Sequence, residues 1–303
     1  RSLAALLEEA RTLAGWDGEG VRLTPMQVGV VDIFVSASDH VRISDAWRMR
    51  VAPLRDGSTD KGLPPVPSLS SILRPYQRRG HAWLTARLSG GIGGILADDM
   101  GLGKTVQILS AVAALRAHKS EETGTPVLVV APTSVVGVWI EQSQQFTPHL
   151  RVRGVTETAT RRGTTIAQEV ADADIVVTSY TLVRLEADQW SQVRLGGIVI
   201  DEAQVVKNPR TATYRALRDL ESPWKLAVSG TPIENSLGDL WSLLSLTCPG
   251  LLPPWETFQQ QVRRPIENGA DSAMLGRLTA YVAPFILRRT KEEVAPDLPD
   301  KIV

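Results

Sequence analysis

The sequence contains very little cysteine and histidine. Cys248 is the single cysteine among 303 residues, so a disulfide within the chain is impossible, which fits a reducing compartment. The four histidines are scattered without the spacing of zinc ligands. We therefore predict no zinc site and interpret Cys248 as a small packed hydrophobe.

An excess of charge of either sign and a long apolar run are also lacking. Lys plus Arg and Asp plus Glu both number 33, so the formal net charge at pH 7 is +0. Binding of nucleic acid through overall positive charge is therefore not indicated, and any such site must be a local patch. No run approaches the ~20 apolar residues of a membrane span, and no signal peptide is evident. We expect no membrane partner. Because the first residue is Arg1, we expect the chain to be a fragment.

The most informative stretch is a glycine-rich loop within residues 93–107 (GGILADDMGLGKTVQ). It follows the apolar run Gly94–Ala97 and precedes a helical pattern that starts at Lys104. This context is typical of a phosphate-binding loop, where backbone N–H groups and the helix dipole attract an anion. We expect Lys104 to reach the β- and γ-phosphates and Thr105 to hold Mg²⁺. Asp98 departs from the general pattern, which has glycine there, and a glycine turn before a helix is the alternative interpretation.

Strand-like and helical patterns alternate from Ile72 onward. Continuous apolar strands between helices predict an α/β fold with a parallel sheet covered by helices on both faces. The expected strands are Gly94–Ala97, Val127–Ala131, Ile175–Thr178, Gly197–Ile200 and Lys225–Val228. The expected helices are Lys104–Ala117, Val136–Phe146, Thr164–Ala171, Thr211–Leu220 and Ser236–Leu246, with Thr257–Arg264 and Ser272–Val282 in a small appendage.

Composition divides the chain into four regions. Residues 56–71 are rich in glycine, proline and serine and predict a linker, which leaves residues 1–55 as an accessory module. Residues 72–247 form the predicted nucleotide-binding lobe, and residues 248–303 the helical appendage.

A second chemical signal is a pair of carboxylates, Asp201 and Glu202, at the end of the apolar strand Gly197–Ile200. Ligands bind at this edge of open α/β sheets. We expect Asp201 to hold Mg²⁺ opposite Thr105 and Glu202 to orient and activate the attacking water. Such a pair is common at strand ends, but together with the loop it indicates a nucleoside triphosphatase.

The motifs, taken in order, resemble those of the SWI/SNF-type helicase-like ATPases of superfamily two. Residues 96–105 (LADDMGLGKT) resemble the family's nucleotide loop, in which an acidic residue at position 98 is usual. Leu73–Gln77 (LRPYQ) resembles the adenine-reading segment, and the amide of Gln77 can both accept from and donate to an adenine edge. Asp201–Gln204 (DEAQ) stands where the family often has Asp-Glu-Ala-His, so Gln204 is a departure. Phe285–Thr290 resembles the segment that closes the family's helical protrusion, and the resemblance covers residues 72–303.

The resemblance implies a role for each motif. The residues expected to bind ATP are Arg74, Gln77, Asp99, Met100, Gly101, Leu102, Gly103, Lys104 and Thr105. Those expected to act in catalysis are Lys104, Asp201, Glu202 and Gln204. Nucleic-acid contacts are expected at Pro132, Thr133, Ser134, Thr178, Ser179 and Tyr180, and coupling at Ser229, Gly230 and Thr231. For the hydroxyl groups, helix capping is the structural alternative. We interpret Arg161–Arg162 as a solvated pair, and expect Arg288 and Arg289 either to contact a nucleic-acid backbone or to be solvated.

The resemblance further implies the first RecA-like lobe of a DNA-dependent ATPase, with ATP and Mg²⁺ as cofactors and duplex DNA and DNA-bound protein as partners. In that family the arginines that complete the site come from a second lobe, so we expect the fragment alone to be poorly active. An RNA-directed helicase and a nucleotide-dependent binding scaffold without efficient catalysis remain alternatives. We expect a cytoplasmic location, meaning the nucleoid of a bacterium or the nucleus of a eukaryote, and the oligomeric state stays open.

Overall fold

The computed structural model describes residues 62–118, 125–230, 236–269 and 272–294. The predicted accessory module, residues 1–55, and the predicted coupling residue Thr231 lie outside these ranges. The predicted linker is described from Gly62 onward, and there it carries a short helix, α4 (Pro67–Ser70). Leu69 in this helix is fully buried, and Leu63 before it packs against the core of the lobe, so the chain joins the lobe before Ile72.

The centre of the molecule is a seven-stranded sheet in the order β3-β4-β2-β5-β6-β1-β7, in which every pairing is parallel. Parallel pairing places the carboxyl ends of all strands at one edge. The register aligns Val129 with both Val177 and Val199 in the middle of the sheet. The strands are β1 (Gly94–Leu96), β2 (Val127–Ala131), β3 (Val152–Val155), β4 (Ile175–Ser179), β5 (Gly197–Ile200), β6 (Lys225–Val228) and β7 (Ile286–Leu287).

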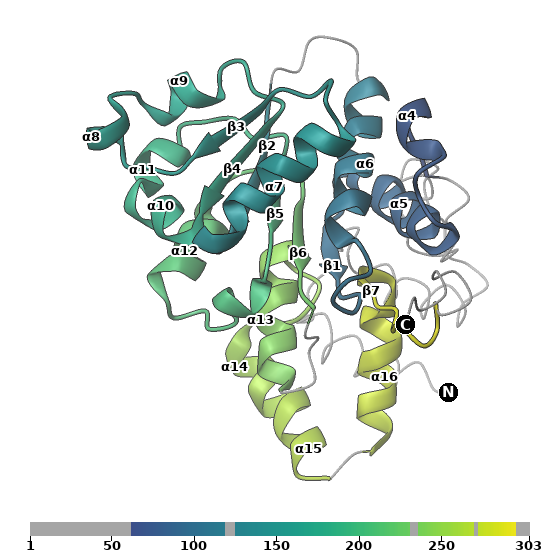
Figure 1. Cartoon of the computed structure of the whole chain (residues 1–303). Helices are drawn as coiled ribbons and strands as arrows, with labels where there is room; N and C mark the ends of the chain where they lie inside the picture. The colour runs from purple at the N-terminus through teal and green to yellow at the C-terminus, as the bar shows by residue number, and fades with distance from the viewer. Residues whose placement is uncertain (1–61, 119–124, 231–235, 270–271, 295–303) are drawn as a thin grey trace, which may run out of the picture.

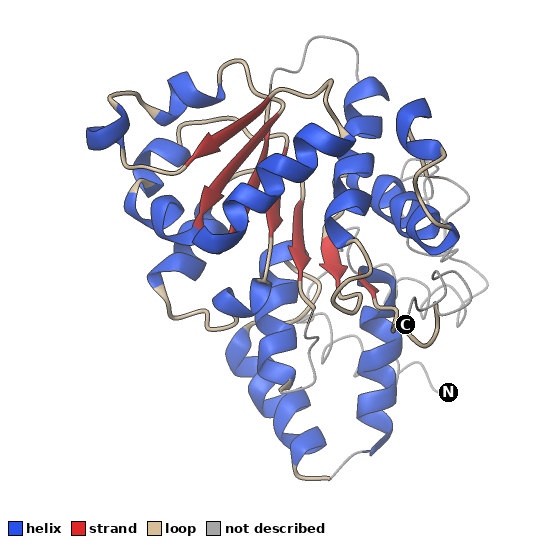
Figure 2. Ribbon diagram, viewed as in Figure 1, coloured by secondary structure: helices blue, strands red, loops and turns tan. Residues whose placement is uncertain are grey.

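Helices cover both faces of this sheet, which confirms the predicted α/β fold (Figures 1 and 2). The helices of the lobe are α5 (Pro75–Leu88), α6 (Lys104–His118), α7 (Thr133–Phe146), α8 (Ala159–Arg162), α9 (Ile166–Val170), α10 (Tyr180–Leu185), α11 (Ala187–Trp190), the 3₁₀-helix η3 (Ala203–Val206), α12 (Ala212–Asp219) and α13 (Leu237–Thr247).

Successive side chains along each strand point to opposite faces of the sheet and pack into two separate cores. Val129 and Val199 pack with α5, α6 and α7 on one face, whereas Leu128 and Ile198 pack with α10, α12 and α13 on the other. Because both faces are covered, nearly every strand position is apolar, and these continuous apolar runs are why the sequence alone located β2, β5 and β6.

The two outer strands were not predicted. β3 lies at one edge of the sheet, is only partly buried and contains Gly154, so its apolar signal is weak. β7 has two residues and lies at the other edge. An edge strand needs less apolar surface than a central one, so its sequence lacks the continuous apolar run by which the central strands were predicted.

A helical protrusion extends from the lobe on the side of α13 (Figure 1). One continuous helical run comprises α14 (Trp255–Phe258), the π-helical turn η4 (Gln259–Arg263) and α15 (Arg264–Glu267). The returning helix α16 (Ser272–Val282) has the predicted bounds and leads through the 3₁₀-helix η5 (Ala283–Phe285) into β7. Phe258 and Leu278 continue the core of the lobe into the protrusion. No helix of the described ranges is long and apolar enough to cross a membrane.

Candidate nucleotide site

The glycine loop leaves β1 at the carboxyl edge of the sheet and ends where α6 begins at Lys104. Gly101 and Gly103 have φ values of +86° and +73°, a left-handed conformation that favours glycine. A Cβ at Gly103 would lie 2.5 Å from Nε2 of Gln77, so the close approach of α5 also requires glycine. The loop therefore has the backbone shape and the helix N-terminus that are typical of a phosphate-binding loop.

Lys104 is the charged group of this loop. Its Nζ donates to the carbonyl oxygens of Asp98 and Asp99, at 2.8 and 3.2 Å. Burial lowers the pKa of Lys104, and the negative charges of Asp98, Glu202 and Asp201 partly oppose that shift. The amine thus lies within the field of the acidic pair at the end of β5, which is the juxtaposition that the two sequence motifs required.

Asp201 is nearly buried, with an exposed fraction of 9%. Its Oδ2 accepts a hydrogen bond of 2.7 Å from Nε1 of Trp139, and its Oδ1 accepts one of 2.9 Å from the backbone N–H of Glu202. Burial raises the pKa of Asp201, whereas these two donors act in the opposite direction. Sequence reasoning missed Trp139, because a tryptophan on the apolar face of α7 is indistinguishable from core packing.

Glu202 is the one non-glycine residue of the described ranges with a positive φ, at +49°. This conformation turns the chain sharply after β5. A hydrogen-bonded chain starts there: Nε2 of Gln204 donates to Oε2 of Glu202 at 2.7 Å, and Oγ of Ser229 donates to Oε1 of Gln204 at 3.1 Å. The backbone N–H of Ser229 donates to the carbonyl oxygen of Leu96. The structure thus brings together the ends of β5, β6 and β1.

Two further loop contacts involve predicted residues. A Cβ at Gly230 would lie 2.6 Å from Cγ of Met100 and 3.4 Å from Nζ of Lys104, so the predicted coupling segment reaches the phosphate loop. The side chain of Met100 is 63% exposed beside it.

The predicted adenine-reading segment adjoins the loop. Oε1 of Gln77 accepts from the backbone N–H of Arg74 at 3.0 Å, and its Nε2 donates to the carbonyl oxygen of Leu102 at 3.3 Å. The hydroxyl of Tyr76 donates to the same carbonyl at 3.1 Å. Gln77 is buried, so both ends of its amide hold the chain segments together, and its role toward adenine stays a prediction.

The six predicted nucleic-acid contacts divide into two groups. Pro132, Thr133 and Ser134 lie at the start of α7, where the last two are exposed. Thr178 is fully buried and its Oγ1 donates to the carbonyl oxygen of Val155 at 2.8 Å, while the hydroxyl of Ser179 caps α10.

Tyr180 is also buried, and its hydroxyl donates to the carbonyl oxygen of Asp201. The side chains of Thr178 and Tyr180 therefore bond backbone carbonyls at the carboxyl edge of the sheet. A contact of this segment with nucleic acid stays a prediction.

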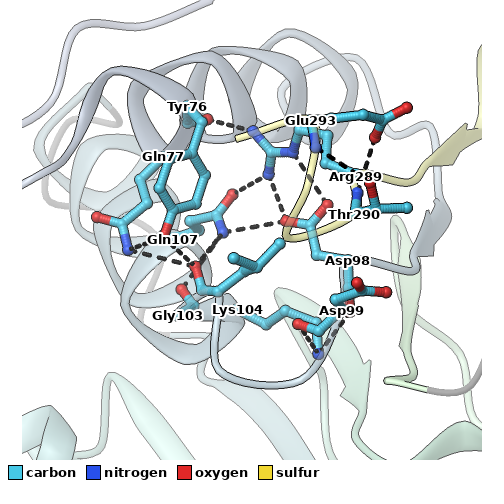
Figure 3. Close-up of polar contacts among 11 residues, drawn as sticks. Tyr76, Gln77, Asp98, Asp99, Gly103, Lys104, Gln107, Arg289, Thr290 and Glu293 are labelled. Carbon is cyan, nitrogen blue, oxygen red and sulfur yellow. Dashed lines mark hydrogen bonds and ion pairs between the residues drawn. The ribbon is translucent and has the colours of Figure 1, made fainter. Parts of the chain in front are cut away.

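Two arginine interpretations were wrong. Arg289 is neither solvated nor on an external surface: its Nε donates to Oδ1 of Asp98 at 3.0 Å, and a second guanidinium nitrogen bonds Oδ2 (Figure 3). Arg162 forms an ion pair of 2.8 Å with Glu186, and their side chains are 9% and 7% exposed. In both cases the acidic partner is distant in the sequence.

The donor set fits a magnesium nucleotide. Mg²⁺ is generally bound by one or two protein oxygens, with the remaining ligands from water and substrate phosphates. The described residues contain no cluster of three or more histidine, cysteine or acidic side chains arranged to hold a metal by themselves. The oriented carboxylate of Asp201 and the hydroxyl of Thr105 in the first turn of α6 match the small donor number of such a site.

Comparison with known proteins places these motifs in context. A family model described as "SNF2-related domain" matches residues 76–303. The putative ATP-dependent helicase/translocase YwqA of Bacillus subtilis is 41% identical over 238 residues, which cover 78% of this chain and 26% of that protein. The TATA-binding protein-associated factor MOT1 of Saccharomyces cerevisiae is 32% identical over 303 residues, with 93% of this chain and 16% of that protein covered.

A solved structure is similar as well. The Sulfolobus solfataricus SWI2/SNF2 ATPase core in complex with double-stranded DNA has a TM-score of 0.67 and 39% sequence identity. The match covers 75% of this chain and 47% of that chain. This chain therefore spans about half of that core and at most 26% of the two curated relatives.

Proposed function

The chain belongs to the SNF2-related domain family of SWI/SNF-type ATPases, and we propose that it is the ATP-binding lobe of a motor that moves along duplex DNA and remodels or displaces bound protein. The observation that carries the proposal is the convergence of Lys104, Asp201 and Glu202 at one edge of the sheet. The double-stranded DNA bound to the similar Sulfolobus core supports duplex DNA as the track. A location with DNA follows, in the nucleoid or the nucleus.

In this proposal ATP is held mainly by the loop. Backbone N–H groups at Gly101 to Gly103 and at the start of α6 bind the β- and γ-phosphates, and Lys104 adds a positive charge. Arg74 and Gln77 bind the adenine side. The pKa of Lys104 is lowered by burial, and a triphosphate would favour the charged amine again by direct attraction.

Thr105 and Asp201 would hold Mg²⁺, which neutralises charge on the phosphates when bound. Trp139 and the N–H of Glu202 each bond a different oxygen of Asp201. These two bonds fix the plane of the carboxylate, so that its remaining lone pairs face a set direction.

Glu202 orients the attacking water and accepts its proton. The water oxygen forms a bond to the γ-phosphorus, the bond to the bridging oxygen of ADP breaks, and ADP and phosphate result. Because Gln204 connects Glu202 to Ser229, a shift of the segment after β6 changes the position of Glu202. This chain of hydrogen bonds is our candidate for the coupling of DNA contact to hydrolysis.

The test is ATP turnover of the full-length protein with duplex DNA, single-stranded DNA or RNA. We expect duplex DNA to stimulate most. Glu202→Gln should lower stimulated turnover by about a hundredfold or more while nucleotide binding persists, because the amide cannot take the proton. Lys104→Ala should lose nucleotide binding. Glu221→Gln is the matched control, since Glu221 is exposed before β6 at the opposite edge, and it should behave as wild type.

Two results would contradict the proposal. Stimulation by RNA alone would assign the chain to an RNA-directed helicase. A failure of all three nucleic acids to stimulate turnover would identify a nucleotide-dependent binding scaffold instead.

A further inference from the structure

Residues 286–294, which we name the strap, run from the end of the helical protrusion along the phosphate loop. β7, at the start of the strap, pairs with β1. The pairing continues past the strand: the N–H of Ala97 donates to the carbonyl oxygen of Leu287 at 2.7 Å, and the N–H of Asp99 donates to that of Arg289 at 3.0 Å. The first part of the phosphate loop therefore has the strap as its backbone partner.

A buried ion pair reinforces this pairing. The carboxylate of Asp98 is fully buried and receives two bonds from the guanidinium of Arg289, whose side chain is 11% exposed. Nε2 of Gln107 donates to the same carboxylate at 3.2 Å (Figure 3). A two-pronged contact between a guanidinium and a carboxylate fixes the mutual orientation of both groups, and burial makes separation costly.

The same guanidinium also contacts Tyr76 in the first turn of α5. It donates to the carbonyl oxygen of Tyr76 and lies 5.5 Å from the centre of that ring. The Tyr76 hydroxyl in turn bonds the carbonyl of Leu102, between the two left-handed glycines. Val294, at the end of the strap, packs on Tyr76 and Leu102. Arg289 is thus connected to the start of the loop through Asp98 and to its middle through Tyr76.

We infer that Arg289 is a positioning residue for the nucleotide: it sets the spacing between the start and the middle of the phosphate loop and ties that loop to the protrusion. This inference rests on the proposed function, because it assumes that the loop binds ATP. It also explains Asp98 physically. Its carboxylate is fully buried and anchors a cation that follows the helical protrusion, 191 residues later.

A comparable ion pair elsewhere separates positioning from stability. Arg162 and Glu186 form a similarly buried pair, with side chains 9% and 7% exposed against 11% and 0% for Arg289 and Asp98, but they join α8 to the end of α10. In Figure 1, α8 lies beside β3, at the edge of the sheet opposite β1 and β7. Loss of either pair leaves a buried charge without its partner, so both losses destabilise the fold.

The experiment compares Arg289→Gln with Arg162→Gln in the full-length protein. Equilibrium binding of a fluorescent ATP analogue, KM and kcat for ATP, and thermal unfolding are measured for each. We expect both variants to lower the melting temperature. Arg289→Gln alone should raise the Kd of the analogue and the KM for ATP about tenfold, because the loop is displaced from its binding geometry.

Arg289→Lys keeps the charge but loses the two-pronged contact, and it serves if the glutamine variant fails to fold. We expect its melting temperature to be close to that of the wild type and its binding of the ATP analogue to be several-fold weaker. Unchanged binding in Arg289→Lys, or equal weakening in Arg162→Gln, would overturn the inference. Absence of stimulated turnover in the wild type would contradict the proposed function only, since analogue binding decides the role of Arg289 separately.

Discussion

Among single residues, the indole of Trp139 stands out because it contacts the carboxylate that we assign to magnesium. Trp139 is 1% exposed and donates its N–H to Asp201 across 62 positions of sequence. It belongs to α7, whose first turn carries the exposed residues Thr133 and Ser134. One side chain thus joins the helix of a predicted nucleic-acid contact to the end of β5.

We predict that Trp139→Phe weakens magnesium-dependent catalysis more than it weakens the fold. Phenylalanine retains most of the packing but cannot donate, and a hydrogen bond to a charged group contributes about 1.5–3 kcal/mol. The Mg²⁺ concentration that gives half-maximal ATP turnover should rise several-fold. Steady-state turnover over a Mg²⁺ titration measures this.

Trp190→Phe provides the control. Trp190 is fully buried, and its Nε1 has no hydrogen-bond partner in the part of the chain that the structure describes. Its replacement should lower thermal stability to a similar degree and leave the Mg²⁺ requirement unchanged. Identical Mg²⁺ curves for the two variants would refute a specific role of Trp139.

Among the elements, α5 is attached to its neighbours through a buried histidine. Nε2 of His81 lies 2.8 Å from the carbonyl oxygen of Leu63, and Nδ1 lies 2.9 Å from Oγ of Ser110 in α6. A neutral ring that donates at Nε2 and accepts at Nδ1 satisfies both contacts. Burial lowers the pKa of His81, although the Leu63 carbonyl acts in the opposite direction.

This shift predicts acid sensitivity of the lobe. With the folded pKa below the unfolded value of 6.5, the unfolded chain binds more protons as the pH falls below that value. The free energy of unfolding should therefore decrease toward acid by up to about 1.4 kcal/mol per pH unit from this group. Urea unfolding at pH 7.5 and pH 5 measures the difference.

His81→Gln should show a smaller difference between the two pH values, because glutamine keeps a donor and does not titrate. His149→Gln, at an exposed position after α7, should retain the full difference. The same acid sensitivity in His81→Gln as in the wild type would contradict the assignment.

At the scale of the whole molecule, the described residues form one seven-stranded sheet with one phosphate loop. The chain matches 47% of the Sulfolobus ATPase core. In the resembled family, arginines from a second lobe stabilise the negative charge on the transferred phosphoryl group. Such arginines raise the rate of hydrolysis about a thousandfold or more.

We therefore predict that residues 1–303 alone hydrolyse ATP about a thousandfold more slowly than the full-length protein with duplex DNA. Steady-state turnover of both proteins at saturating ATP is the measurement. Lys104→Ala in the isolated chain sets the background from contaminating ATPases. Robust DNA-stimulated turnover by the isolated chain would disprove the prediction.

The amino-acid sequence by itself determined the elements whose signals are local. The continuous apolar runs of β2, β5 and β6 marked interior strands, and the glycines before Lys104 marked the loop. Asp201 and Glu202 were identified for the same reason, since the chemistry of a strand end is readable from adjacent residues.

Only the tertiary structure decided which distant side chains meet. It paired Asp98 with Arg289 and Asp201 with Trp139, and it buried Tyr180 beneath the site. The physical reason is that the order of strands in the sheet, and not their order in the chain, determines which strand ends are neighbours. Side chains at those ends gain their partners and become buried from solvent only when the connections between the strands have folded.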